Sequence, residues 1–189
     1  MANALSHGNE FHPIKRLDKN GNRLSVEFLF QMLKPAICVL LEKGIKVIIV
    51  TLGSDGVLLC SSEWSDFIQK TVKKKNSCTF DQGLCKLVSS SCSADQLIDG
   101  IDFKTGRSNP FTLHFPALPA SVVSLIGAGD CLVGGTLASL CVGLDIMQSI
   151  AVGVAASKAA VETEYNIPPE YCLTRIAGFC EKLYMLAKF

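Results

Sequence analysis

Residues 124–135 read SLIGAGDCLVGG, a glycine-rich turn that leads into an apolar segment. Gly127 and Gly129 allow the backbone to turn tightly and to bring its N–H groups close to a ligand. A helix that begins at this point presents unpaired N–H donors and the positive end of its dipole, and together these bind phosphate. The stretch therefore predicts a phosphate-binding turn followed by a helix.

One acidic residue, Asp130, follows this turn directly. A carboxylate would weaken simple anion binding, because two neighbouring negative charges repel each other. The arrangement suits a general base that takes a proton from a hydroxyl while nearby amides stabilise charge on a transferring phosphoryl group. The chemistry indicated is phosphoryl transfer, with Asp130 as the candidate catalytic base.

Two other interpretations of residues 121–144 are open from composition. The stretch carries one charge in 24 residues, long enough to cross a bilayer. Asp130 would then lie near the bilayer middle at a cost of a few kcal/mol, and each glycine weakens a helix by about 1 kcal/mol relative to alanine. The membrane interpretation is thus disfavoured. A buried glycine-containing helix without chemistry is the stronger alternative.

A second motif lies upstream, in residues 46–60, which read KVIIVTLGSDGVLLC. The uninterrupted β-branched run 47–50 is typical of a strand buried on both faces. Thr51, Gly53 and Gly56 follow in the pattern T-x-G-x-x-G, and the polar residues inside the pattern signal a turn before a second apolar run. Alone, the motif predicts a hairpin. Because the GAGD stretch lies downstream in the same chain, we expect this hairpin to have a functional role as well.

TLGSDG and GAGD together, with a segment of small residues after the second, resemble the C-terminal half of a ribokinase-like (PfkB-type) carbohydrate kinase. VTLGSDGVLLC, HFPALP and SLIGAGDC are most similar to the kinase part of eukaryotic pseudouridine-metabolising bifunctional proteins. In those proteins a pseudouridine-5'-phosphate glycosidase domain precedes the PfkB-type domain. The resemblance covers most of residues 14–185 and is weak at about 66–108.

This resemblance implies a fold of the α/β class, a ribokinase-like three-layer α/β/α sandwich of which residues 1–189 supply a partial domain, the C-terminal half only. It also implies a role for each motif residue. Asp130 would be the catalytic base. The backbone N–H groups of Gly127, Ala128 and Gly129 would form the anion hole. Thr51, Gly53 and Gly56 of the upstream motif would line the phosphate side of an ATP site.

The small residues of the segment 147–162 would form a wall near the adenine, although Ala and Gly at helical spacing more often mark close helix packing. They are Ala151, Gly153, Ala155 and Ala156. The implied activity is ATP-dependent phosphoryl transfer to a sugar or nucleoside hydroxyl, with pseudouridine favoured. The expected partner is a small-molecule substrate, with no nucleic acid and no membrane, and a fused glycosidase domain would lie upstream in the full-length protein.

Two departures from the family pattern concern the cofactors. Ser124-Leu125-Ile126 stands where such kinases commonly carry Asp-Thr-Thr, and that Asp helps to hold a monovalent cation in many members. Activation by a monovalent cation is therefore in doubt. The Asn-x-x-Glu motif that organises Mg²⁺ in the family is absent, so no metal ligand is assigned in this chain.

In the family, that motif and the substrate-binding strands would precede a segment resembling Met1–Leu5. The chain thus resembles part of a longer kinase. The alternative is a catalytically incompetent truncated fragment that acts at most as an interaction module.

Composition narrows the class of protein only in part. The 189 residues are 49% hydrophobic and 19% charged, values typical of a globular but rather apolar domain. A net charge of +1 gives no electrostatic argument that the chain binds nucleic acid or an anionic surface. The nine cysteines contain no CxxC pair, which disfavours zinc and fits reduced thiols in a cytoplasmic protein. No apolar signal segment begins the chain, and a mitochondrial address stays open.

One helix is expected to precede four strands and three helices to follow them, with one long irregular stretch between the second and third strands. That stretch, 69–109, shows little periodicity and is predicted to be a mobile insertion. The expected helices are 25–43 (interrupted near Pro35), 128–142, 146–163 and 169–187, and the expected strands are 46–51, 57–60, 111–118 and 121–125.

Overall fold

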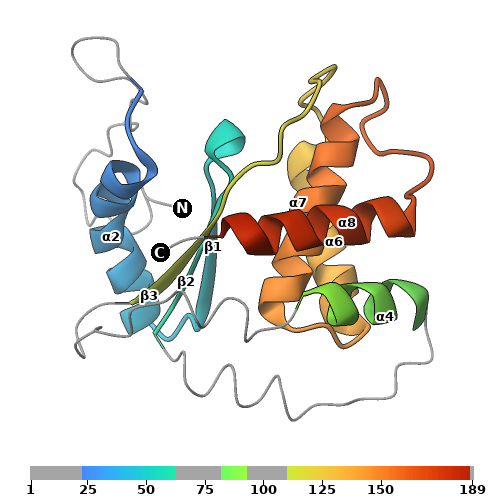
Figure 1. Ribbon diagram of the computed structural model, residues 1–189. Coiled ribbons are helices and arrows are strands. Elements are labelled where there is room, and N and C mark those ends of the chain that lie inside the picture. The colour runs from blue at the N-terminus through green and yellow to red at the C-terminus, as the bar shows by residue number, and fades with distance from the viewer. Residues whose placement is uncertain (1–22, 63–81, 93–109, 188–189) are drawn as a thin grey trace.

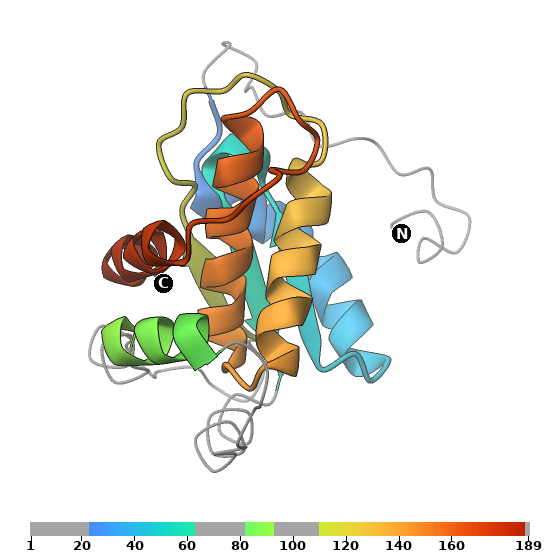
Figure 2. The ribbon, with the colours of Figure 1, turned by 90° about the vertical axis from the view of Figure 1, so that its right-hand side faces the viewer.

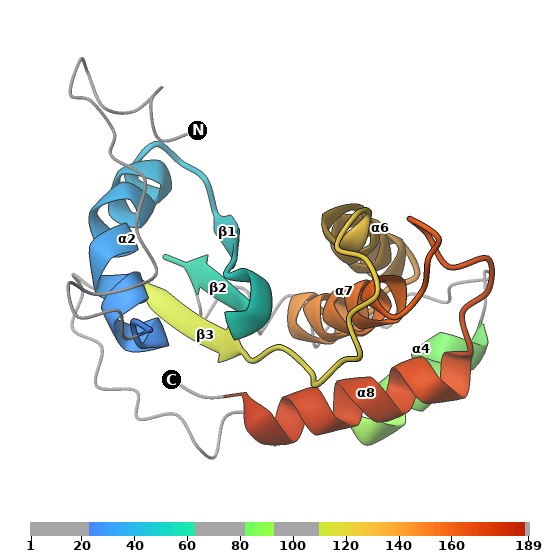
Figure 3. The same cartoon turned by 90° about the horizontal axis from the view of Figure 1, so that it is seen from above.

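The computed structural model describes residues 23–62, 82–92 and 110–187, which form three layers (Figures 1 and 3). The middle layer is a sheet of three strands, and one helix covers its first face while four helices lie on the other side. The strands are β1 (Val47–Thr51), β2 (Val57–Ser61) and β3 (Phe111–Phe115); α2 (Val26–Glu42) is the single helix, and α4 (Gln82–Ser91), α6 (Ala128–Cys141), α7 (Ile146–Val161) and α8 (Leu173–Leu186) lie opposite. The expected α/β class and three-layer arrangement are confirmed.

The strands follow the order β1-β2-β3 and pair antiparallel throughout. Thr51 pairs with Val57, so β1 and β2 form the predicted hairpin, closed by the 3-10 turn η1 (Gly53–Asp55). Phe115 also pairs with Val57, on the far side of β2. In the described part of the chain β2 is therefore the central strand, and β1 and β3 are the outer ones.

The strand expected at 121–125 is wrong. Residues 116–127 form no strand, and the N–H groups of Val123 and Ser124 instead bond to the carbonyl of Val161, at 2.7 and 3.3 Å. Pro116 and Pro119 flank a segment that has no neighbouring strand among the described residues, so this backbone satisfies its donors on the end of α7.

Side chains of β2 point alternately into two cores. Val57 and Leu59 face α4, α7 and α8, whereas Leu58 and Cys60 face α2, where they meet Ile37. All five residues of β2 are buried, because both faces of this strand are covered.

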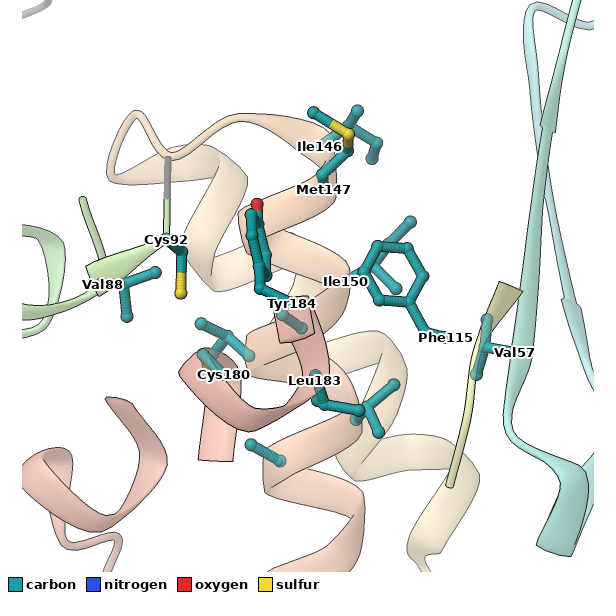
Figure 4. Packing of buried hydrophobic residues seen from close by; sticks show 14 of the residues in the cluster. Val57, Val88, Cys92, Phe115, Ile146, Met147, Ile150, Cys180, Leu183 and Tyr184 are labelled. Carbon is teal, nitrogen blue, oxygen red and sulfur yellow. The ribbon is translucent and has the colours of Figure 1, made fainter. Parts of the chain in front are cut away.

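The larger core lies between β3 and the helices α7 and α8 (Figure 4). The Phe115 and Tyr184 rings are 6.5 Å apart between centroids and tilted by 56°. Ile150 and Leu183, both fully buried, pack around them. The Tyr184 hydroxyl is also buried here, and no described group bonds to it.

Helix α2 begins at the N-cap Ser25, whose hydroxyl accepts a hydrogen bond from the Phe28 N–H at 3.2 Å. The expected interruption near Pro35 is wrong, since the helix continues from Val26 to Glu42 through this residue. Packing of the apolar side of α2 on the sheet, with Ile37 buried, offsets the hydrogen bond that proline cannot make.

Helix α4 lies inside the predicted insertion 69–109 and packs against α8. Val88 and Cys92 are fully buried in the larger core, and Gln148 Nε2 donates to the Cys92 carbonyl at 2.8 Å. This part of the insertion is thus a packed element of the fold. Its apolar periodicity was hidden by the polar sequence around it, and residues 69–81 and 93–109 lie outside the described residues.

Helices α6 and α7 agree with the expected ranges within two residues at each end. Helix α7 starts with a capping box between Asp145 and Gln148. Helix α6 has 14 residues, and no helix in the described ranges is long and apolar enough to cross a membrane.

Candidate active site

The GAGD turn sits at the start of α6, and its shape depends on Gly127. This residue is the N-cap of α6 and has φ +82°, a left-handed conformation that costs other residues energy. A Cβ placed on Gly127 would lie 1.8 Å from the carbonyl oxygen of Asn166. Glycine is therefore required here both by conformation and by the loop that packs against the turn.

Some backbone N–H groups at the start of α6 are open. Among the described residues no group accepts a hydrogen bond from the N–H of Gly129, and a Cβ there would meet nothing within 4 Å. The Ala128 N–H donates to the Leu125 carbonyl at 3.4 Å, which is a long and weak bond. The Gly129 amide thus fits the predicted anion hole best, and the role of all three amides stays a prediction.

Asp130 lies in the first turn of α6 and is exposed. Its carboxylate forms no ion pair with any residue in the described ranges. A negative charge is stabilised in the first turn of a helix by the unpaired N–H groups there. The side chain is therefore accessible to a substrate, as a general base must be.

The T-x-G-x-x-G turn is closed by its own backbone. The Leu52 N–H donates to the Gly56 carbonyl at 2.7 Å, and the Gly56 N–H donates to Gly53 at 3.0 Å. Both glycines have positive φ, +57° and +95°. A Cβ on Gly56 would come within 2.1 Å of the Phe115 carbonyl, so this glycine lets β3 leave the sheet. Thr51, at the end of β1, is exposed. Backbone geometry explains both glycines, and contact of the turn with ATP stays a prediction.

Two side chains outside either motif hold this turn in place. Arg23 Nη2 pairs with Asp55 Oδ1 at 2.7 Å and also donates to the Ser54 hydroxyl. His114 Nε2 lies 2.6 Å from the Asp55 carbonyl oxygen and donates to it. Arg23 belongs to no recognisable motif, and His114 begins the HFPALP segment, which assigned it no role, so the fold reveals their contact with the turn.

The two predicted halves of the site lie at the same end of the molecule. Figures 1 and 2 show η1 and the N-terminal end of α6 both at the upper end of the layers. No hydrogen bond joins the two turns within the residues that the structure describes. The fold thus brings the motifs to one end without direct contact between them.

The loop 162–172 packs against the segment around the GAGD turn. No role for this loop was predicted from the sequence. Glu162 accepts hydrogen bonds from Lys158 and from the Ser121 N–H (3.3 Å), and Arg175 lies 3.4 Å away. The bond from Lys158 holds the pKa of Glu162 below its ordinary value. Tyr171 donates to the Cys131 sulfur at 3.2 Å, and burial raises the pKa of Tyr171.

The predicted adenine wall on α7 is wrong. Its four residues, Ala151, Gly153, Ala155 and Ala156, are all buried in the fold. A Cβ on Gly153 would lie 2.2 Å from Thr136 Oγ1, and one on Gly135 would lie 3.2 Å from the Gly153 Cα. These small residues allow α6 and α7 to approach closely, which is the alternative that their spacing had left open.

The structure is that of an α/β chain whose glycine turn presents an open amide and an exposed carboxylate at a helix start. A family model described as "pfkB family carbohydrate kinase" matches residues 99–170, which include this turn, α6 and α7. The chain is also 48% identical, over all 189 residues, to an Arabidopsis thaliana protein described as "Pseudouridine kinase". Residues 99–170 of the chain are thus similar to the pfkB family of carbohydrate kinases.

The chain spans about half, 48%, of the length of that Arabidopsis relative. Among solved structures, ribokinase from Thermotoga maritima is similar, with 20% sequence identity and a TM-score of 0.46. The match covers 79% of this chain and 35% of the ribokinase chain.

Proposed function

We propose that this chain carries the general-base and phosphate-binding part of a kinase that transfers the γ-phosphoryl group of ATP to a sugar or nucleoside hydroxyl. Pseudouridine is the favoured acceptor, because the relative that matches the whole chain is described as a pseudouridine kinase. The observation that carries the proposal is Asp130, an exposed carboxylate that follows the open amide of Gly129 at the start of α6.

In the proposed reaction Asp130 accepts the proton of the acceptor hydroxyl as its oxygen attacks the γ-phosphorus, and ADP leaves. The Gly129 N–H, with those of Gly127 and Ala128, stabilises the negative charge on the transferring group. The Ala128 amide would first have to give up its long bond to Leu125. Thr51, Gly53 and Gly56 would face the other phosphates of ATP.

The described residues offer no cluster of ligands for the metal ion that accompanies ATP. They contain no group of three or more His, Cys, Asp or Glu side chains that could hold a metal ion. The Mg²⁺ of the proposed reaction is therefore assigned no ligand from this part of the chain. Ser124 stands where the family's cation-associated Asp is common, and its hydroxyl accepts the Ile126 N–H at 3.2 Å. Dependence on a monovalent cation is not proposed.

The second candidate is a catalytically incompetent fragment that acts as an interaction module. The observation that favours it is the absence of the family's Asn-x-x-Glu motif from these 189 residues. A fused glycosidase domain and a cytoplasmic location stay predictions in both cases.

One assay separates the two candidates. The purified chain and a chimera, in which this chain replaces the matching stretch of the Arabidopsis relative, are each supplied with ATP, Mg²⁺ and pseudouridine. Phosphorylated pseudouridine is expected from the chimera and not from the chain alone or from heat-killed controls. An inactive chimera that is folded would contradict the kinase proposal, and turnover by the chain alone would contradict the fragment interpretation.

A further inference from the structure

Helix α6 begins without a side chain that caps it. Its N-cap residue, Gly127, has no side chain that could accept a hydrogen bond from the first turn. Helices α2 and α7 begin differently, at Ser25 and Asp145, whose side chains accept bonds from backbone N–H groups. The Asp130 carboxylate also forms no ion pair within the ranges that the structure describes. The position of the proposed base therefore depends on what holds the backbone of this first turn.

Cys131, the residue after Asp130, links this turn to the loop between α7 and α8, which passes the start of α6 (Figure 2). The Cys131 N–H donates to the Gly127 carbonyl at 2.9 Å and so closes the first turn of the helix. The Cys131 sulfur accepts a hydrogen bond from the Tyr171 hydroxyl at 3.2 Å, and it lies 3.9 Å from the Asn166 carbonyl oxygen. The neighbour of the proposed base is thus bonded to the loop through its side chain and to the turn through its backbone.

The Tyr171 ring packs beside this hydrogen bond. Cys131, Ala156 and Ala160 form a small buried cluster between α6 and α7, and Tyr171 packs against it. Because the two alanine side chains are short, the ring can approach the sulfur. Burial raises the pKa of Tyr171, and the bond to Cys131 raises it further, so the hydroxyl keeps its proton and remains a donor near neutral pH.

We propose that Tyr171 is a positioning residue for Asp130 and acts through Cys131. The inference rests on the proposed function, in which Asp130 is the general base. The Tyr171 hydroxyl fixes the Cys131 side chain, and Cys131 directly follows Asp130 in the first turn of α6. The bond therefore does what a capping side chain does at other helix starts, and it holds the base in place for the transfer. Misplacement of a reacting group by about 1 Å can cost about 10²-fold in rate.

The test measures turnover of the chimera, with ATP, Mg²⁺ and pseudouridine, for Tyr171→Phe in two backgrounds. This substitution keeps the ring and removes only the hydroxyl. With Asp130 present, kcat is expected to fall about 10-fold and the KM for ATP to change by less than about twofold. In the Asp130→Asn background the same substitution should leave the remaining turnover unchanged, because no base is left to position. An equal fall in both backgrounds would indicate a merely structural role and would overturn the inference.

Two substitutions of Cys131 test whether Tyr171 acts through this residue. Cys131→Ser keeps an atom that can accept the Tyr171 hydroxyl, so kcat should stay within about threefold of its original value. Cys131→Ala removes the acceptor and should lower kcat as much as Tyr171→Phe does. Combining Cys131→Ala with Tyr171→Phe should then lower kcat no further, since both remove the same interaction. Equal losses for the serine and alanine variants, or additive losses for the combination, would overturn the inference.

Tyr184→Phe is the matched control. It removes another tyrosine hydroxyl, which is buried on α8 and has no hydrogen-bond partner among the described residues. This substitution should leave kcat unchanged. A loss of kcat equal to that of Tyr171→Phe would overturn the inference, because the effect would then not depend on the bond to Cys131.

Amide hydrogen exchange gives a readout that needs no catalysis. In the purified chain, the Cys131 N–H is expected to exchange about tenfold faster after Tyr171→Phe and at its original rate after Tyr184→Phe. Unchanged exchange after Tyr171→Phe would overturn the inference, even with an active chimera. A folded chimera without turnover, together with faster exchange after Tyr171→Phe, would contradict the proposed function and would still support the hold of Tyr171 on the turn.

Discussion

The backbone of Gly127 lies directly against that of Asn166: a Cβ on Gly127 would come within 1.8 Å of the Asn166 carbonyl oxygen and 2.7 Å of its carbonyl carbon. The turn that positions Asp130 is therefore shaped by the loop around Asn166, which lies 39 residues after Gly127 in the chain. The Asn166 carbonyl also lies near the Cys131 sulfur. The position of the proposed base thus depends on the packing of this loop as well as on α6.

Gly127→Ala is expected to destabilise the fold. The left-handed φ alone costs a non-glycine residue about 1–3 kcal/mol, and the clash with the Asn166 backbone adds to this. The free energy of unfolding of the chain, measured in urea, should fall by at least that amount.

Gly129→Ala is the control, because its Cβ would meet nothing within 4 Å. It should leave the free energy of unfolding unchanged or raise it by up to about 1 kcal/mol. Equal destabilisation by the two substitutions would show that the contact with Asn166 does not shape the turn.

Gly153→Ala is expected to separate α6 from α7. The new Cβ would lie 2.2 Å from Thr136 Oγ1 and 2.5 Å from the Leu132 carbonyl oxygen, and overpacking of this kind costs about 1–3 kcal/mol. Gly178→Ala in α8, where a Cβ has open space, should instead stabilise the chain by about 0.5–1 kcal/mol. Urea unfolding of the two variants side by side checks this. Similar effects from both would rule out close helix packing as the role of Gly153.

Tyr184→Phe is expected to stabilise the chain by about 1 kcal/mol, because it removes a buried hydroxyl that no described group satisfies. The ring remains and keeps its contact with Phe115. Tyr171→Phe is the opposite case, since that hydroxyl donates to the Cys131 sulfur and its loss should cost about 0.5–1 kcal/mol. Thermal unfolding would contradict this account if Tyr184→Phe lowered Tm.

Local patterns predicted the elements that carry strong periodicity or turn chemistry. The hairpin around Gly53 and Gly56 and the start of α6 after Gly127 were predictable, because each depends on residues adjacent in the chain. The resemblance to the pfkB family, drawn from the same two motifs, agrees with the family match over residues 99–170.

Features that depend on distant contacts were not predictable. Helix α4 has few apolar residues, and it is stabilised through Val88, which reaches the core between α7 and α8. Arg23, His114 and Asn166 contact the two turns only after folding, and their neighbours in the sequence do not reveal these contacts. The predicted adenine wall on α7 was wrong for the same reason, since small residues at helical spacing do not reveal whether a helix or a ligand lies against them.

The central claim is that Asp130 is the general base of a phosphoryl transfer. The direct test is the turnover of the chimera with ATP and pseudouridine before and after Asp130→Asn, with Glu42→Gln as a control at an exposed carboxylate at the end of α2. The account predicts a fall in kcat of about 10²- to 10⁴-fold for Asp130→Asn, with Tm and the KM for ATP nearly unchanged, and full activity for Glu42→Gln. Near-normal turnover of the Asp130→Asn variant would contradict it.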